Sequence, residues 1–202
     1  MSFHPLMAYD RARFQKSERK IADEGAPFVF TPERRAKLDD ILTRYPPDRK
    51  RSAVLAALYL VQEQVGYVTA AGMRHVAGVL DLAPAEVEDV ATYYVMFFKE
   101  PVGKHVLQVC RTLSCALMGA ERVTEALSDK LGIKVGETDA SGMFTLLEFE
   151  CLGACDRAPV VMVNNEQWHE CVRPEDVGRL VDDLSQSKGE AAFSGCHLKV
   201  EA

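Results

Sequence analysis

Two pairs of cysteines, each placed directly after an apolar stretch, constrain this chain more than any other feature. The stretch "HVLQVC" at residues 105–110 ends in Cys110, and Cys115 follows after four residues. The stretch "GMFTLLEFEC" at residues 142–151 ends in Cys151, and Cys155 follows after three. Both stretches favour β-strands. Because α/β proteins bind ligands beyond the carboxyl ends of their strands, two neighbouring strands would bring all four thiols to one edge of a sheet.

The rest of this half of the chain mixes further strands with helices. The segment at residues 117–132 is amphipathic and closes at Gly132, which predicts a helix. Apolar segments at residues 159–164 and 167–172 flank the turn "NNE" and predict a hairpin, and residues 174–184 predict a closing helix. We therefore expect an α/β sandwich of thioredoxin size over residues 104–184, followed by a polar tail at 185–202.

The first half of the chain predicts helices only. Residues 31–46, 51–66, 69–82 and 83–98 carry apolar side chains at helical spacing. Thr31 and Thr69 are suitable N-cap residues, and a proline follows Thr31 at the first helical position. These patterns predict a small helical bundle over residues 29–100, preceded by a polar arm at 1–28.

Composition excludes several classes of function. The chain has 202 residues, of which 48% are apolar, and these values indicate a soluble globular protein of one or two domains. Its net charge of −6 argues against a partner that is a nucleic acid. No apolar run reaches the roughly 18–20 residues that cross a bilayer, so we expect no direct membrane contact. Without a recognisable signal peptide, we expect a reducing compartment, where cysteines indicate a metal or catalytic site before disulfides.

The cysteine spacing favours some chemistries over others. Structural zinc sites commonly use cysteines two to four residues apart, and the first pair is wide for that pattern. A [2Fe–2S] cluster has two irons that each take two thiolates, and wide loops with small residues such as Ser114, Gly153 and Ala154 suit it better. Thiol–disulfide exchange normally uses two intervening residues, which neither pair has. Zinc binding, dithiol chemistry and inert buried cysteines stay open as alternatives to the cluster.

Longer motifs add a family resemblance. The segments "VCRTLSC", "FECLGAC", the following "AP" and "MVN", and the upstream "VATYYVMF" together resemble the small [2Fe–2S] subunit of NADH:quinone oxidoreductase, respiratory complex I. The resemblance runs from about Thr31 to Leu184. It implies a helical bundle followed by a thioredoxin-like ferredoxin domain, with one [2Fe–2S] cluster. It assigns four cluster ligands: Cys110, Cys115, Cys151 and Cys155. Many relatives have proline before the second ligand, where this chain has Ser114.

The same resemblance implies partners and a location. A flavoprotein subunit would bind FMN and NADH, since this chain has neither G-x-G-x-x-G after a strand nor a P-loop motif. Its cluster would exchange an electron with that FMN, alongside further iron–sulfur subunits. The expected place is the peripheral arm of a membrane complex, on its cytoplasmic or matrix-equivalent side. Two alternatives stay open. The chain is the equivalent subunit of an NAD-linked hydrogenase or formate dehydrogenase, or it belongs to a different class of protein, an interaction module stapled by zinc.

Two further expectations concern residues near the ligands. Four ligands complete a cluster, so we expect Cys171 and Cys196 to be non-ligands, with Cys171 packed in a strand at residues 168–172. Glu148, Glu150 and Asp156 flank the second cysteine pair. Negative charges near a cluster oppose the addition of an electron, so we expect a low reduction potential.

Overall fold

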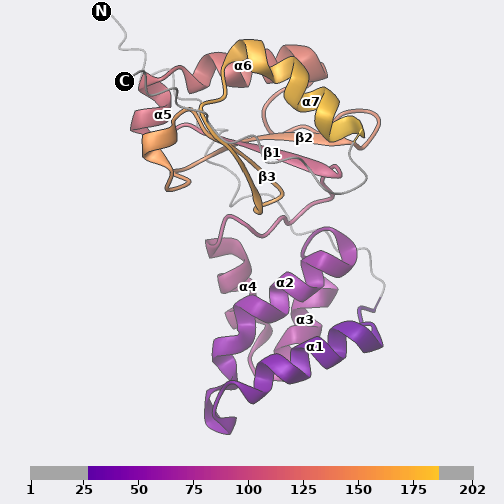
Figure 1. Ribbon diagram of the computed structural model, residues 1–202. Coiled ribbons are helices and arrows are strands. Elements are labelled where there is room, and N and C mark those ends of the chain that lie inside the picture. Colours follow the sequence, from indigo (N-terminus) through magenta and orange to yellow (C-terminus); the bar gives the residue numbers. More distant parts are fainter. Residues whose placement is uncertain (1–26, 187–202) are drawn as a thin grey trace, which may run out of the picture. The chain divides into compact units, whose positions relative to one another are not determined.

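The computed structural model describes residues 27–186 (Figure 1). The chain divides into two compact units, Met1–Pro101 and Val102–Ala202. Most of the polar arm predicted at residues 1–28, and the predicted tail from residue 187 onward, lie outside the described residues.

The described part of the first unit is a bundle of four α-helices, in agreement with the sequence. The helices are α1 (Pro32–Thr43), α2 (Val54–Val65), α3 (Ala70–Leu80) and α4 (Pro84–Tyr93), with a 3-10 helix, η3 (Pro47–Ala53), before α2. The Thr31 and Thr69 hydroxyls accept hydrogen bonds from backbone N–H groups in the first turns of α1 and α3, as expected of N-caps. The core of this unit is apolar and includes fully buried side chains from every helix: Leu38, Leu58, Val61, Val76 and Val87.

The prediction that the fourth helix runs to residue 98 is wrong. The helix ends at Tyr93, and Tyr94 has an extended backbone with ψ of 116°. Beyond it, the Gln62 side chain donates to the backbone carbonyl of Met96 at 3.0 Å and accepts from the N–H of Phe98 at 2.8 Å. These bonds to α2 replace the helical hydrogen bonds that the segment would otherwise make.

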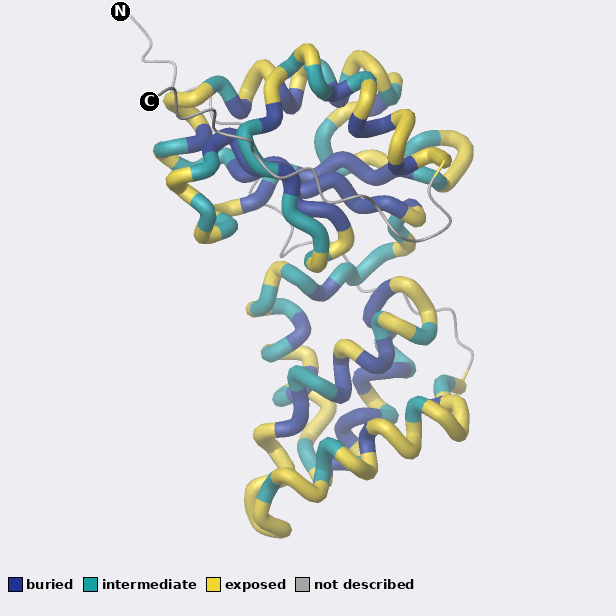
Figure 2. Tube along the Cα trace, viewed as in Figure 1, coloured by how far each residue is buried: buried dark blue, intermediate teal, exposed yellow. Residues whose placement is uncertain are grey.

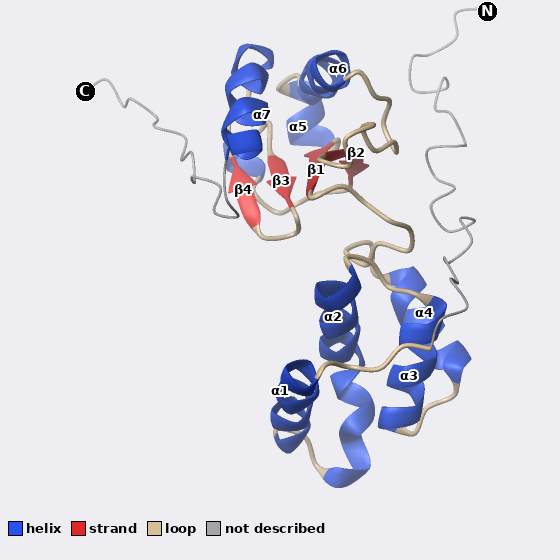
Figure 3. Ribbon diagram, turned by 90° about the vertical axis from the view of Figure 1, so that its right-hand side faces the viewer, coloured by secondary structure: helices blue, strands red, loops and turns tan. Residues whose placement is uncertain are grey.

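The second unit has the strand order and helix placement of a thioredoxin-like sandwich. Its sheet has the order β2-β1-β3-β4, with β1 (His105–Cys110) parallel to β2 (Phe144–Phe149). Strand β3 (Val161–Val163) is antiparallel to β1 and forms the predicted hairpin with β4 (Gln167–His169). Helices α6 (Ala120–Leu131) and α7 (Val177–Gln186) lie together over one face of the sheet (Figures 1 and 3).

Short elements complete this unit and shift some predicted boundaries. They are α5 (Leu113–Leu117), η4 (Cys155–Arg157) and η5 (Pro174–Asp176). The helix predicted from residue 117 begins instead at Ala120, because Gly119 has a φ of 93° and interrupts the helical backbone between α5 and α6. Helix α7 continues to Gln186, two residues into the predicted tail.

Strand β1 is the centre of the sheet. All six of its residues are buried, including Gln108 with no exposed surface, and the tube in Figure 2 shows this buried band. The Gln108 side-chain amide donates to Asn165 Oδ1 at 2.7 Å, and its oxygen accepts from the Asn165 N–H at 3.1 Å. Asn164 and Asn165, with φ values of 56° and 61°, form the β3–β4 turn. A buried polar side chain therefore fixes that turn to β1.

At Gly103, just before β1, the backbone lies so close to β2 that no side chain fits between them. A side-chain carbon there would lie 2.8 and 2.9 Å from the backbone C and N atoms of Phe144, closer than real contacts allow. We expect Gly103→Ala to lower the free energy of unfolding by roughly 1–3 kcal/mol. The matched control is Gly178→Ala in α7, where nothing lies within 4 Å and alanine should stabilise by roughly 0.5–1 kcal/mol. Urea unfolding followed by circular dichroism measures both, and equal effects would contradict this account.

Candidate metal centre

The pairing of β1 with β2 brings the two cysteine loops together. The strands run parallel and in register, with Cys110 opposite Phe149. Cys110 is the last residue of β1, as predicted, whereas Cys151 lies two residues beyond the end of β2 rather than at its end. The expectation that the two strands are neighbours is correct, so both loops leave the same edge of the sheet.

The first pair is buried. Cys110 and Cys115 are each 2% exposed, and their side chains are hydrogen-bonded to each other. Burial, followed by the hydrogen bond to Cys110, raises the pKa of Cys115 to about 11. Burial alone would also raise the pKa of Cys110, but hydrogen bonds to its sulfur, led by those from the backbone N–H groups of Thr112 and Leu152, leave that pKa lowered. The site therefore already directs N–H donors at one sulfur.

The second pair is exposed. Cys151 Sγ and Cys155 Sγ lie 3.4 Å apart, at the two ends of a short loop. Gly153 in that loop has a φ of 88°, a conformation that favours glycine. The hydrogen bond to Cys151 is the largest cause that raises the pKa of Cys155. The site therefore presents one pair of thiols to solvent.

The two pairs form one group of interacting sulfurs. Cys155 interacts electrostatically with Cys110 and Cys115, and its side chain is hydrogen-bonded to Ser114 from the first loop. Helix α5, which carries Cys115, contacts η4, which begins at Cys155. The four sequence-predicted residues are thus brought together by β1, α5 and the loop after β2.

The donor set fits a two-iron cluster. All four groups are thiols, arranged as two pairs, and each iron of a [2Fe–2S] cluster takes two thiolates. Within residues 27–186, no group of three or more Cys, His, Asp or Glu side chains is arranged so that it could hold a metal ion, and the fit to the cluster therefore rests on the pairing of the thiols. Backbone N–H groups of Thr112, Leu152 and Val160 donate to the buried sulfurs, and hydrogen bonds to sulfur are among the factors that set the potential of such a cluster.

The other candidate residues have separate roles. Cys171 lies outside β4, with a φ of 51°, and is disulfide-bonded, so the prediction that it is a packed strand residue is wrong. Its bonded sulfur is no thiolate ligand, and Cys196 lies outside the described residues. Sequence reasoning missed Thr112 and Leu152, whose N–H groups carry no signal in the sequence.

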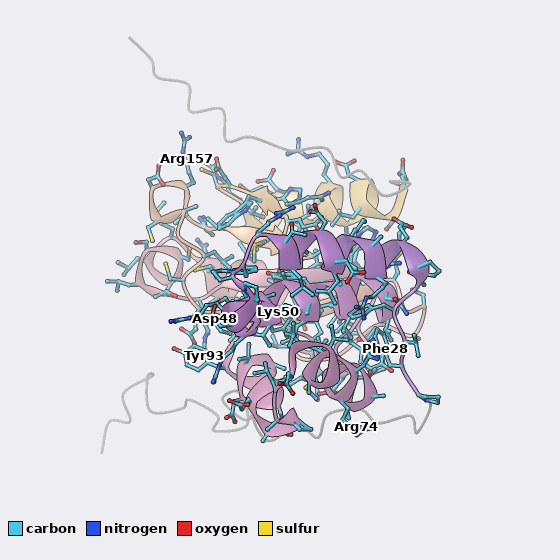
Figure 4. The ribbon with its side chains drawn as sticks, turned by 90° about the horizontal axis from the view of Figure 1, so that it is seen from below. Phe28, Asp48, Lys50, Arg74, Tyr93 and Arg157 are labelled. Carbon is cyan, nitrogen blue, oxygen red and sulfur yellow. The ribbon has the colours of Figure 1, made fainter. Side chains whose placement is uncertain are left out.

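Acidic residues beside the second pair are partly neutralised. Glu150 forms an ion pair with Arg111, the residue that follows Cys110. Asp156 Oδ2 lies 3.5 Å from Nε of Arg157, which is labelled in Figure 4. At least two of the charges expected to lower the reduction potential therefore have cationic partners, and the low potential stays a prediction.

Comparisons with known proteins place the chain in a family. The model of the thioredoxin-like [2Fe-2S] ferredoxin family matches residues 38–185, so the chain belongs to this family, as the motifs indicated. The chain is 40% identical over 179 residues to an NADH-quinone oxidoreductase subunit of Mycobacterium bovis, covering 87% of this chain and 70% of the relative. It is 39% identical over 158 residues to the corresponding subunit of Rickettsia bellii, covering 78% and 94%. The expected [2Fe–2S] cofactor is thereby confirmed.

The fold is also found among solved structures. An NAD+-reducing [NiFe]-hydrogenase in the air-oxidised state matches with a TM-score of 0.58 over 70% of this chain and 25% of that one. The two sequences are 17% identical in this match, so the likeness shows the fold alone.

The unequal burial of the two pairs predicts unequal reactivity in cluster-free protein. We expect iodoacetamide to alkylate Cys151 and Cys155 on the order of tenfold or more faster than Cys110 and Cys115, because buried thiols react only after local opening. Peptide mass spectrometry over a time course measures the four rates. Denatured protein is the control, in which the four rates should converge. A buried thiol that reacts as fast as the exposed pair would contradict the geometry.

Proposed function

We propose that this chain is the electron-transfer subunit of an NADH-quinone oxidoreductase, and that Cys110, Cys115, Cys151 and Cys155 hold its [2Fe–2S] cluster. The observation that carries the proposal is the convergence of two thiol pairs at the carboxyl ends of parallel neighbouring strands, in a chain of the [2Fe-2S] ferredoxin family. Relatives at about 40% identity, which are named as subunits of NADH-quinone oxidoreductase, support the choice of complex.

The two thiol pairs contribute differently to holding the cluster. Cys110 and Cys115 sit in the core and would be the fixed ligands, because packing against α6 and the sheet holds them. Cys151 and Cys155 are exposed and would close the site from the solvent side. A bound [2Fe–2S] cluster supplies one-electron chemistry, in which one ferric iron becomes ferrous and returns. We infer that an electron reaches the site from the side of the exposed pair.

The electron donor we infer is FMN on a partner flavoprotein subunit that also binds NADH. The absence of nicotinamide and phosphate-binding motifs from this sequence supports a donor on another chain. Further iron–sulfur subunits would accept electrons in the same peripheral arm, on the cytoplasmic or matrix-equivalent side. Among the helices of residues 27–186, none has the length and apolarity of a membrane span.

Ligand replacement tests the assignment of the cluster. We expect Cys151→Ser to abolish the cluster or reduce its occupancy severalfold, because one iron then loses one of its two thiolates. The matched control is Cys171→Ser, which also removes a cysteine of the second unit and should leave the iron and acid-labile sulfide content unchanged. Metal analysis, visible absorbance and electron paramagnetic resonance measure both. A colourless wild-type protein that holds one zinc, or cluster loss in Cys171→Ser, would contradict the assignment.

Affinity purification of the full chain from its native membranes tests the choice of complex. We expect a flavoprotein that contains FMN to co-purify with a membrane arm and with NADH-dependent quinone reduction. The competing assignment is a subunit of a hydrogenase, because an NAD+-reducing hydrogenase shares the fold. Co-purification with a nickel-containing subunit and hydrogen-dependent reduction of NAD would assign the chain to a hydrogenase instead.

A further inference from the structure

Thr112 occupies a position where threonine usually caps a helix, yet its hydroxyl is hydrogen-bonded to a cysteine sulfur instead. It is the N-cap residue of α5, with an extended backbone, and its side chain makes no capping hydrogen bond. In the same position before α1 and α3, Thr31 and Thr69 both accept a capping hydrogen bond. The Thr112 Oγ1 atom instead accepts a hydrogen bond from the free Cys110 thiol, at 3.8 Å from Sγ, and a ligand thiolate at the same place has no proton and can only accept one.

Helix α5 begins at Thr112 although the Thr112 hydroxyl does not cap it. The Thr112 carbonyl accepts a hydrogen bond from the N–H of Ala116 at 2.9 Å, as the start of α5 requires. The side chain is half-buried and its neighbour Cys110 is 2% exposed. In such an environment of low dielectric constant, a hydrogen bond to sulfur is stronger than it would be in water.

We propose that the Thr112 hydroxyl donates a hydrogen bond to Cys110 Sγ that favours reduction of the cluster. The inference rests on the proposed function, because it requires Cys110 to be a ligand. Reduction adds one electron and changes the charge of a four-thiolate cluster from about −2 to −3, with no proton transferred and no bond broken. A hydrogen-bond donor directed at a ligand sulfur stabilises the reduced, more negative cluster more strongly than the oxidised cluster. Thr112 is thus a positioning residue for electron transfer.

The test compares three full-length proteins that carry their clusters. Thr112→Val keeps the shape of the side chain and removes the hydroxyl, whereas Thr112→Ser keeps the hydroxyl and serves as the matched control. Dithionite, a one-electron donor, reduces each protein in a titration followed by electron paramagnetic resonance. We expect the equilibrium constant for reduction to fall about three- to tenfold in Thr112→Val, which corresponds to about 30–60 mV. The serine variant should keep the wild-type midpoint potential, and all three should keep equal iron and sulfide contents.

The other outcomes separate failure of this inference from failure of the proposed function. An unchanged or raised midpoint potential in Thr112→Val, with its cluster intact, overturns the inference and leaves the proposed function standing. A serine variant that shifts as far as the valine variant also overturns it, since the hydroxyl is then not the cause. If Thr112→Val holds no cluster, Thr112→Ala takes its place in the titration. Cluster loss in both variants, with Thr112→Ser intact, would make the hydroxyl an assembly requirement and overturn the tuning role. Wild-type protein without iron and sulfide would contradict the proposed function itself.

Discussion

The parallel, in-register pairing of β1 with β2 is the constraint on which the site depends. It sets Cys110 opposite Phe149 and so determines where the loop to Cys151 starts. A change of register by one residue would turn every side chain of one strand to the other face of the sheet. Hydrogen bonds at both ends of the pair hold the register. The Gly103 N–H donates to Thr145 Oγ1 at 2.6 Å at one end, and the Arg111 N–H donates to the Phe149 carbonyl at 3.0 Å at the other. The contacts that align the thiols therefore lie along the whole strand pair, including the end farthest from them.

The unequal burial of the ligands has an electrostatic consequence. Placing two thiolates in an apolar core costs free energy unless donors or cations compensate the charge. The N–H groups of Thr112 and Leu152 direct such donors at Cys110, and the Val160 N–H reaches Cys115. The exposed pair needs less compensation because water solvates it. The donors therefore gather on the buried half of the site, where their effect on charge is largest.

Local chemistry made much of the fold predictable, and tertiary contacts account for the errors. N-cap threonines and stop glycines act within a few residues, so the starts of α1 and α3 and the ends of α2 and α6 follow from the sequence. The four cysteines could be placed because each pair follows a strand-like run. The end of α4 could not be placed, since it depends on Gln62, some thirty residues earlier in the chain. The disulfide state of Cys171 likewise has no local signature.

Thr112 shows why a side chain beside a metal site is hard to interpret from sequence. A threonine at the start of a helix is normally an acceptor for the first-turn N–H groups. A hydroxyl has one proton to donate and two lone pairs to accept, so its role depends on its strongest neighbour. Beside Cys110 the neighbour is a sulfur, and a sulfur bound to iron has no proton to give. The hydroxyl must then be the donor, whereas the free Cys110 thiol donates its own proton to the hydroxyl oxygen. Binding of the cluster would therefore reverse the direction of this hydrogen bond, which the sequence alone leaves undetermined.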